Sequence, residues 1–221
     1  SSVSRIANHG SKDVFAFSPN KSMVATWAQG ATVVDIYTSG ATTWGFGYRI
    51  NNPGGSGIEV ESLTWLNDTD LMIGMPTFST NKGRIEVWTT ADGGDNFSEV
   101  TGDGLTGNTN DYLGASLYYQ TSSGNTIVGT YYSNTSQPNL SAELGKLYLY
   151  ESSSNGYMPA SYSTRTEITT ASIRAPYGAY LAVDPDDGAR FILQTKGHTS
   201  APYQATLIAV ESGSSGWKYT T

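Results

Sequence analysis

The feature that most constrains the fold of this chain is a sequence pattern that recurs about every 50 to 65 residues. Each unit has an apolar strand, a variable loop, a second strand, and a Ser/Gly-rich turn followed by an aromatic residue. The second strands end at Tyr37, Trp88, Tyr150 and Val210, and the aromatic residues after the turns are Trp44, Phe97, Tyr157 and Trp217. A further strand precedes each unit, as in "VFAFSPN" and "YGAYLAVDPDDG". Four strands in each of four units predict an all-β fold, a β-propeller of four four-stranded antiparallel blades.

We expect residues 1–221 to form one domain, with blades at about 13–50, 58–102, 111–168 and 175–221. Apolar and polar residues alternate with a period of two nearly everywhere, which predicts almost no helix. Residues 1–12 contain "SRIAN", which resembles "YRINN" at 48–52 and therefore predicts an outer strand without a blade of its own. This strand either closes the ring against the last blade, or pairs with another copy or with blades upstream. We expect closure of the ring.

The composition excludes several classes of partner. The net charge is −7, and the 12 basic residues are scattered singly, which argues against nucleic acid and against an anionic membrane surface. No apolar run approaches the ~20 residues that a spanning helix needs, so we expect no membrane insertion. The absence of cysteine excludes disulfides and thiolate metal sites.

The start of the chain and its sequons bear on how the protein is processed and where it is located. The chain starts at Ser1 without a methionine, which indicates that it is processed or cut from something longer. Glycosylation sequons of the form Asn-x-Ser/Thr occur at Asn20, Asn67, Asn96, Asn134 and Asn139. We therefore predict an extracellular location, or one on a cell or particle surface, for a glycoprotein.

The second and third units resemble FG-GAP repeats, the blades of integrin-α-like propellers. In "YLGASLYY", residues 113–116 stand where the family has Phe-Gly-x-Ser, and "IGMP" at 73–76 resembles its Ile-Gly-Ala-Pro. The resemblance covers about residues 13–221 and implies a propeller. FG-GAP repeats often hold Ca²⁺ in the loop between their first two strands, and the best match is "DPDDG" at 184–188. Asp184 and Asp186 are therefore calcium candidates, with a plain Asp/Gly turn as the alternative, and no other cofactor is expected.

The segment "WTTADGGDNFSEV" at 88–100 predicts a tight turn. Asp92 can accept backbone N–H bonds from the residues after it, and Gly93 and Gly94 tolerate positive φ. Its pattern from Thr90 to Phe97 also resembles an Asp-box, the hairpin turn of sialidase-like and sortilin-like propellers, although Asn96 stands where that family usually has Thr. An Asp-box is a structural signature, so we expect Asp92 to be structural.

The loops between the second and third strands of the blades are expected to share one end of the propeller. They bring together aromatic rings, amides and charged groups, a combination that suits contact with a sugar or a peptide. The candidate ligand-binding residues are Phe78, Lys82, Tyr131, Tyr132, Asn134, Glu143, His198 and Tyr203. The alternative for Tyr131 and Tyr132 is that they continue a strand and pack within the blades.

Catalysis finds little support in the sequence. The six arginines occupy dissimilar places, so the arginine cluster of sialidases is not expected, and His9 and His198 lie in unrelated loops. We therefore predict a non-catalytic recognition module whose partner is a glycan or an extracellular protein. The alternatives are a structural subunit of a filament, coat or matrix that self-associates, and a glycosidase-like propeller enzyme.

Overall fold

The computed structural model describes residues 13–109, 111–120, 124–129, 147–152, 156–159, 161 and 164–168, followed by four strands between residues 179 and 220. All its strands pair antiparallel, in four sheets of four consecutive strands each. This confirms the expected fold class of four-stranded antiparallel sheets.

The first sheet contains β1 (Val14–Phe17), β2 (Met23–Trp27), β3 (Val33–Ser39) and β4 (Trp44–Asn51). The second contains β5 (Ser62–Trp65), β6 (Asp70–Met75), β7 (Arg84–Thr89) and β8 (Ser98–Thr106). The third contains β9 (Ser116–Gln120), β10 (Asn125–Gly129), β11 (Leu147–Tyr150) and β12 (Thr166–Glu167). The fourth contains β13 (Ala179–Val183), β14 (Arg190–Thr195), β15 (Leu207–Gly213) and β16 (Gly216–Thr220). One short helical segment, α1 (Phe78–Asn81), lies between β6 and β7.

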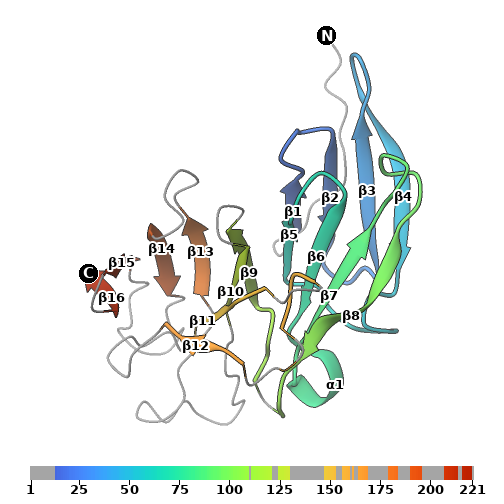
Figure 1. The fold of residues 1–221 in the computed structure, drawn as a ribbon. Coiled ribbons are helices and arrows are strands. Elements are labelled where there is room, and N and C mark those ends of the chain that lie inside the picture. Colours follow the sequence, from blue (N-terminus) through green and yellow to red (C-terminus); the bar gives the residue numbers. More distant parts are fainter. Residues whose placement is uncertain are drawn as a thin grey trace.

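The first strands of successive sheets are neighbours, as the inner strands of propeller blades are. Strand β1 contacts β5, β5 contacts β9, and β9 contacts β13. Figure 1 shows the sheets following one another, with the first and the fourth on opposite sides of the molecule. Within the described residues the four sheets form an open arc. The expected closing strand at 1–12 lies outside those residues, so ring closure stays a prediction.

The first and second sheets pack face to face around an apolar core. Alternate residues of β2, including Met23, Ala25 and Trp27, meet Leu63 and Trp65 of β5. Fully burying one large apolar side chain contributes roughly 1.5–3 kcal/mol, so this interface is a main source of stability. A hydrogen bond also joins the two sheets directly, because the Trp65 Nε1–H donates to the carbonyl of Ala16 in β1 at 3.0 Å.

The second and third sheets share another core and a backbone seam. Met72, Ile85 and Val87 of the second sheet pack against Leu117 and Tyr150 of the third. At the seam, Gly83 forms a parallel bridge with Leu113, and the hydroxyl of Ser62 donates to the carbonyl of Gly114 at 2.6 Å. The seam anchors the base of the α1 loop, which contains two of the candidate site residues.

Candidate functional site

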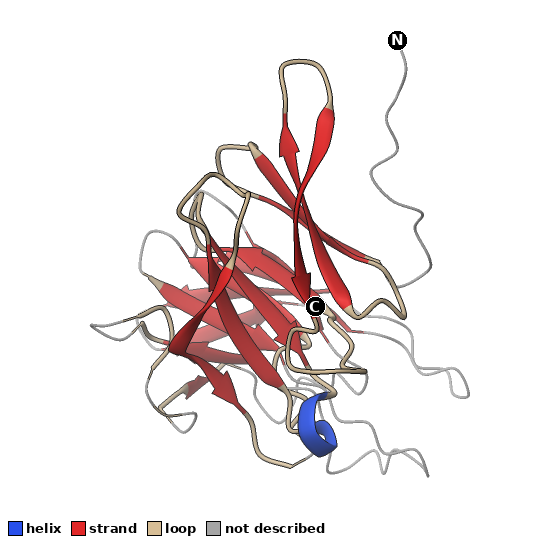
Figure 2. Ribbon diagram, turned by 90° about the vertical axis from the view of Figure 1, so that its right-hand side faces the viewer, coloured by secondary structure: helices blue, strands red, loops and turns tan. Residues whose placement is uncertain are grey.

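The described candidate residues, Phe78 and Lys82, lie in the loop between β6 and β7, around α1. Figure 2 shows α1 at one end of the stacked sheets. With Arg84, the first residue of β7, they form what we call the α1 surface. The other candidates lie outside the described residues, and so do the calcium candidates; these are Tyr131, Tyr132, Asn134, Glu143, His198 and Tyr203, and Asp184 and Asp186.

The backbone of the α1 loop has an unusual conformation that the seam holds in place. Ser79, Thr80 and Asn81 have φ values of 44°, 60° and 60°, in the left-handed region that non-glycine residues seldom adopt. Tyr112 N–H donates to the carbonyl of Asn81 at 2.9 Å, and Leu113 N–H donates to that of Lys82 at 3.2 Å. Such strain persists only where surrounding structure imposes it, and it concentrates at functional sites.

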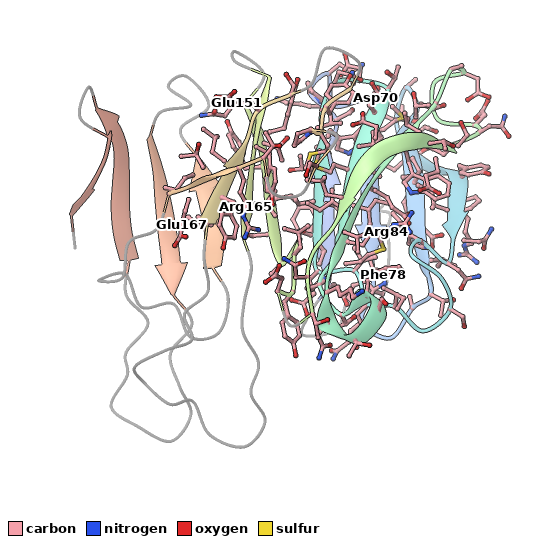
Figure 3. All side chains as sticks on the ribbon, turned by 60° about the horizontal axis from the view of Figure 1, so that its bottom comes forward. Asp70, Phe78, Arg84, Glu151, Arg165 and Glu167 are labelled. Atoms are coloured by element: carbon pink, nitrogen blue, oxygen red, sulfur yellow. The ribbon has the colours of Figure 1, made fainter. Side chains whose placement is uncertain are left out.

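Arg84 is the side chain of the α1 surface with the most contacts to its neighbours. The Arg84 guanidinium lies 5.2 Å from the centre of the half-buried Phe78 ring, and Figure 3 shows the two side by side near α1. Arg84 also pairs with Glu86 through Nε at 2.9 Å and with Glu99 through Nη2 at 2.8 Å. The ammonium group of Lys82 has no hydrogen bond or ion pair with the residues that the structure describes. Among the described residues, Lys82 is therefore the cation of this surface that no other side chain pairs with.

Glu86 is a buried carboxylate that links two sheets. Its side chain is nearly inaccessible, and it accepts bonds from the Gly54 N–H at 3.2 Å and the Trp88 Nε1–H at 3.0 Å. Burial raises the pKa of Glu86, although Trp88, Arg84 and Gly54 oppose the shift. Sequence reasoning missed this residue. A signal was present in the sequence. Arg84 and Trp88 each lie two positions from Glu86, and residues two apart on a strand share one face, so the three side chains can be expected to meet.

A second polar cluster lies at the other end of β6, where Figure 3 shows Asp70. The hydroxyl of Tyr157 donates to Asp70 Oδ2 at 2.6 Å, and Asn67 Nδ2 donates to the same oxygen at 2.7 Å. Burial raises the pKa of Asp70, but hydrogen bonds from Thr89, Tyr157, Asn67 and Thr69 outweigh it and leave the pKa lowered. These contacts tie the third sheet to the second and leave Asp70 poorly suited to be a proton donor.

A third carboxylate makes a similar cross-sheet link. Asp103 of β8 is buried and accepts the N–H groups of Tyr157 at 2.9 Å and Met158 at 2.8 Å. Tyr157 is the aromatic residue that follows the turn of the third unit. Tyr157 therefore packs against a neighbouring sheet, as Phe97 also does in the first core.

The turn at Asp92 has the expected hydrogen bonds. Asp92 Oδ1 accepts the N–H groups of Asp95 at 3.1 Å and Asn96 at 2.9 Å, and Gly93 and Gly94 have φ values of 75° and 108°. Hydrogen bonds from the Asn96 and Thr90 side chains, together with these N–H groups, lower the pKa of Asp92 to about 2. All these partners belong to the turn itself, which is what a structural role requires.

We predict that Asp92→Ala lowers the thermal midpoint. Because the folded-state pKa is depressed, the stabilisation is fully present above the unfolded pKa of about 4 and is lost as the pH falls through about 2. The difference between wild type and variant in thermal melts should therefore be large at pH 6 and shrink toward pH 2. Asp95→Ala is the control, because it removes a neighbouring exposed carboxylate of the same charge. An equal loss in both variants would contradict the prediction.

The glycosylation sequons differ in what their amide nitrogens contact. Asn67 Nδ2 donates to Asp70 and to Tyr157, and Asn96 Nδ2 donates to Asp92 Oδ2 at 2.6 Å. Asn20 is exposed at the turn between β1 and β2. Asn134 and Asn139 lie outside the described residues, and use of the five sequons stays a prediction.

Two general properties follow from the described part of the chain. It contains no group of three or more His, Cys, Asp or Glu side chains placed to hold a metal ion. No helix among the described residues is long and apolar enough to cross a membrane.

No family model and no curated protein matches the sequence. Solved structures do match. A protein from Lactobacillus plantarum has a TM-score of 0.64 and 12% identity over 94% of this chain and 55% of its own. A putative 6-phosphogluconolactonase from Bacteroides uniformis has a TM-score of 0.57 and 8% identity over 94% and 52%. Kuenenia stuttgartiensis hydrazine synthase has a TM-score of 0.59 and 12% identity over 89% and 51%.

The sheet order, the neighbouring inner strands and these matches define a propeller-like all-β protein. The chain spans about half the length of each of these three structures. Two of those structures are named as enzymes, but at such identities the likeness shows the fold alone. The expectation that this chain is not an enzyme stays a prediction, as do the resemblances to FG-GAP repeats and to the Asp-box.

Proposed function

We propose that this chain is a non-catalytic recognition module that binds a glycan or an extracellular protein through the α1 surface. The observation that carries the proposal is a strained loop, fixed by backbone bonds from the connection before the third sheet. It holds Phe78 and Lys82, and Lys82 has no side-chain partner among the described residues. Rigid presentation favours binding, because less conformational freedom is lost when the ligand arrives.

The chemistry of the surface fits a polar ligand with an apolar side. The Phe78 ring can contact the apolar face of a sugar or a side chain, while Lys82 and the exposed hydroxyls of Ser79 and Thr80 offer polar contacts. Five of the described carboxylates support a binding role rather than catalysis, because their bonds hold the fold. Asp35 pairs with Arg49, and Asp70, Glu86, Asp92 and Asp103 hold the contacts described above.

The test is a glycan array and an extracellular-protein pull-down with the wild-type chain, followed by Lys82→Ala and Phe78→Ala. We expect each substitution to weaken binding about tenfold or more while the thermal midpoint falls only slightly for Lys82→Ala. The control is Lys21→Ala, which removes the same charge at the β1–β2 turn, at the opposite end of the sheets. Binding that both lysine variants weaken equally, or that neither weakens, would refute the α1 surface as the site.

A structural subunit that self-associates is the second candidate. The observation that favours it is a group of exposed aromatic rings on the first sheet, with Phe15 62%, Phe17 48% and Phe46 57% exposed. Contiguous apolar surface of this kind marks sites of protein contact.

A further inference from the structure

One face of the first sheet carries aromatic side chains that none of the described sheets covers. Phe15 and Phe17 of β1 contact each other with ring centres 6.1 Å apart, and Phe17 contacts Trp44 at 5.8 Å. Tyr37 of β3 contacts Phe46 of β4 at 5.9 Å. Alternate residues of the same strands pack on the second sheet, so these five rings lie on the face turned away from it. We call them the open face.

The strand registers show which residues of the second sheet correspond to the open face. In the first sheet Phe17, the last residue of β1, pairs with Val24, which pairs with Tyr37. In the second sheet the last residue of β5 heads the corresponding row, which is Trp65, Leu71 and Trp88. All three pack into the core between the first and second sheets. The second sheet therefore uses this face to dock on the sheet before it.

The third sheet uses the same face in the same way. Its corresponding row is Tyr119, Thr126 and Tyr150. The two tyrosines pack into the core between the second and third sheets. Both described sheets that have a predecessor thus cover it with this face, and the open face has the aromatic residues for the same contact.

A carboxylate on the open face extends the correspondence. Asp35 of β3 matches Glu86 of β7, because each lies two residues before the last member of its row. Glu86 accepts the N–H of Gly54, which belongs to the connection between the first and second sheets. The carboxylate of Asp35 binds Arg49 at 2.7 and 3.0 Å and receives no backbone N–H from the described residues. Asp35 therefore occupies the position at which a connection from a preceding sheet would bind.

The sequence before β1 repeats the segment that leads from the first sheet to the second. Residues 5–10 read RIANHG and residues 49–54 read RINNPG, so Arg, Ile, Asn and Gly recur at the same spacing. In the segment at 49–54, Ile50 is buried in the core between the two sheets, and Gly54 donates to Glu86. Residues 5–10 lie outside the described residues, but Gly10 has the place of Gly54 in the pattern. The sequence at 5–10 is therefore typical of a chain that leaves one sheet for the next.

We propose that a further four-stranded sheet, preceding β1 in the same polypeptide, docks on the open face as the first sheet docks on the second. Residues 5–10 join this sheet to β1, and Asp35 accepts a backbone N–H from them as Glu86 does from Gly54. The docking face of the preceding sheet is of the kind that the first sheet presents to the second, with alternating apolar residues such as Met23, Ala25 and Ile36.

This inference goes beyond ligand binding at the α1 surface and does not depend on it. It gives the exposed rings a partner other than a second copy of the chain. Its test therefore also distinguishes it from the self-associating subunit, the second candidate function.

The test extends the chain with a sheet whose docking face is described. A copy of residues 13–48 is joined to residues 5–221, so that Arg5 follows the copied Tyr48 as Arg49 follows it in the first sheet. Phe15→Cys in residues 5–221 then reports whether the open face is covered, because the chain has no native cysteine. We expect maleimide to react with this cysteine at least about tenfold more slowly in the extended chain than in the unextended one.

The matched control places the single cysteine at position 15 of the copied sheet instead. That sheet has no sheet before it, so its cysteine should react as quickly as in the unextended chain. Adding Phe17→Asp beside the reporter in residues 5–221 should restore fast reaction in the extended chain. Adding Thr101→Asp, which introduces the same charge at an exposed position of β8, should not. Circular dichroism of each variant checks that fast reaction reports an uncovered face in a folded chain.

Three results would overturn the proposal. Equally fast reaction in the extended and unextended chains would show that a preceding sheet does not dock on the open face. Slow reaction in the unextended chain at every protein concentration would show that the chain covers this face itself. Slow reaction in the unextended chain at high concentration alone would show that a second copy covers it, and would favour the self-associating subunit.

Discussion

Gly83→Ala should lower the free energy of unfolding by about 3 kcal/mol or more. A Cβ at this position would overlap the backbone of Leu113, which cannot move without opening the seam between the second and third sheets. Gly83 also has a φ of 75°, which L-residues adopt at a cost of roughly 1–2 kcal/mol. The overlap adds about 1–3 kcal/mol more. Equilibrium unfolding in urea measures the sum.

Gly93→Ala is the matched control. Gly93 has the same φ of 75°, but an added Cβ would meet no atom within 4 Å. Its substitution therefore isolates the backbone term, and we expect a loss of about 1 kcal/mol. Equal losses of unfolding free energy at the two positions would mean that the backbone at Leu113 can shift at little cost. In that case the rigid presentation on which the α1 surface depends would lose its support.

Glu86→Ala should lower the free energy of unfolding by about 3 kcal/mol. The substitution leaves the Gly54 N–H and the Trp88 Nε1–H without their acceptor, and Arg84 loses the buried one of its two partners. Removing one member of a buried charged network costs more than the pair itself contributes, because the remaining groups stay desolvated. Urea unfolding gives the stability, and near-ultraviolet circular dichroism reports the loosened Trp88.

Glu99→Ala provides the comparison for that result. Glu99 pairs with the same guanidinium at 2.8 Å, but its side chain is 41% exposed. Exposed ion pairs contribute about 0–1 kcal/mol, so this loss should be small. If Glu99→Ala costs as much as Glu86→Ala, burial is not what makes the Glu86 network stabilising.

Only part of the candidate site could be predicted from the sequence. The loop between β6 and β7 was predicted because the repeat places all such loops at one end, and Phe78 and Lys82 do lie there. The repeat could not show that Phe78 contacts Arg84, or that Glu86 is buried beneath it. The burial of Glu86 depends on the connection at Gly54 between the first and second sheets, which contacts it from 32 positions away. The Phe78–Arg84 contact depends on the left-handed conformation of the loop between them.

The four sheets, their strand order and the turn at Asp92 could all be predicted from the amino-acid sequence. These features depend on alternation, turn residues and the recurring aromatics, all of which act over a few neighbouring positions. Which face of each sheet is covered depends instead on contacts between sheets. Phe17 and Trp65 occupy corresponding positions in the repeat, yet one is 48% exposed and the other is buried, because a preceding sheet lies against Trp65 and none of the described sheets lies against Phe17.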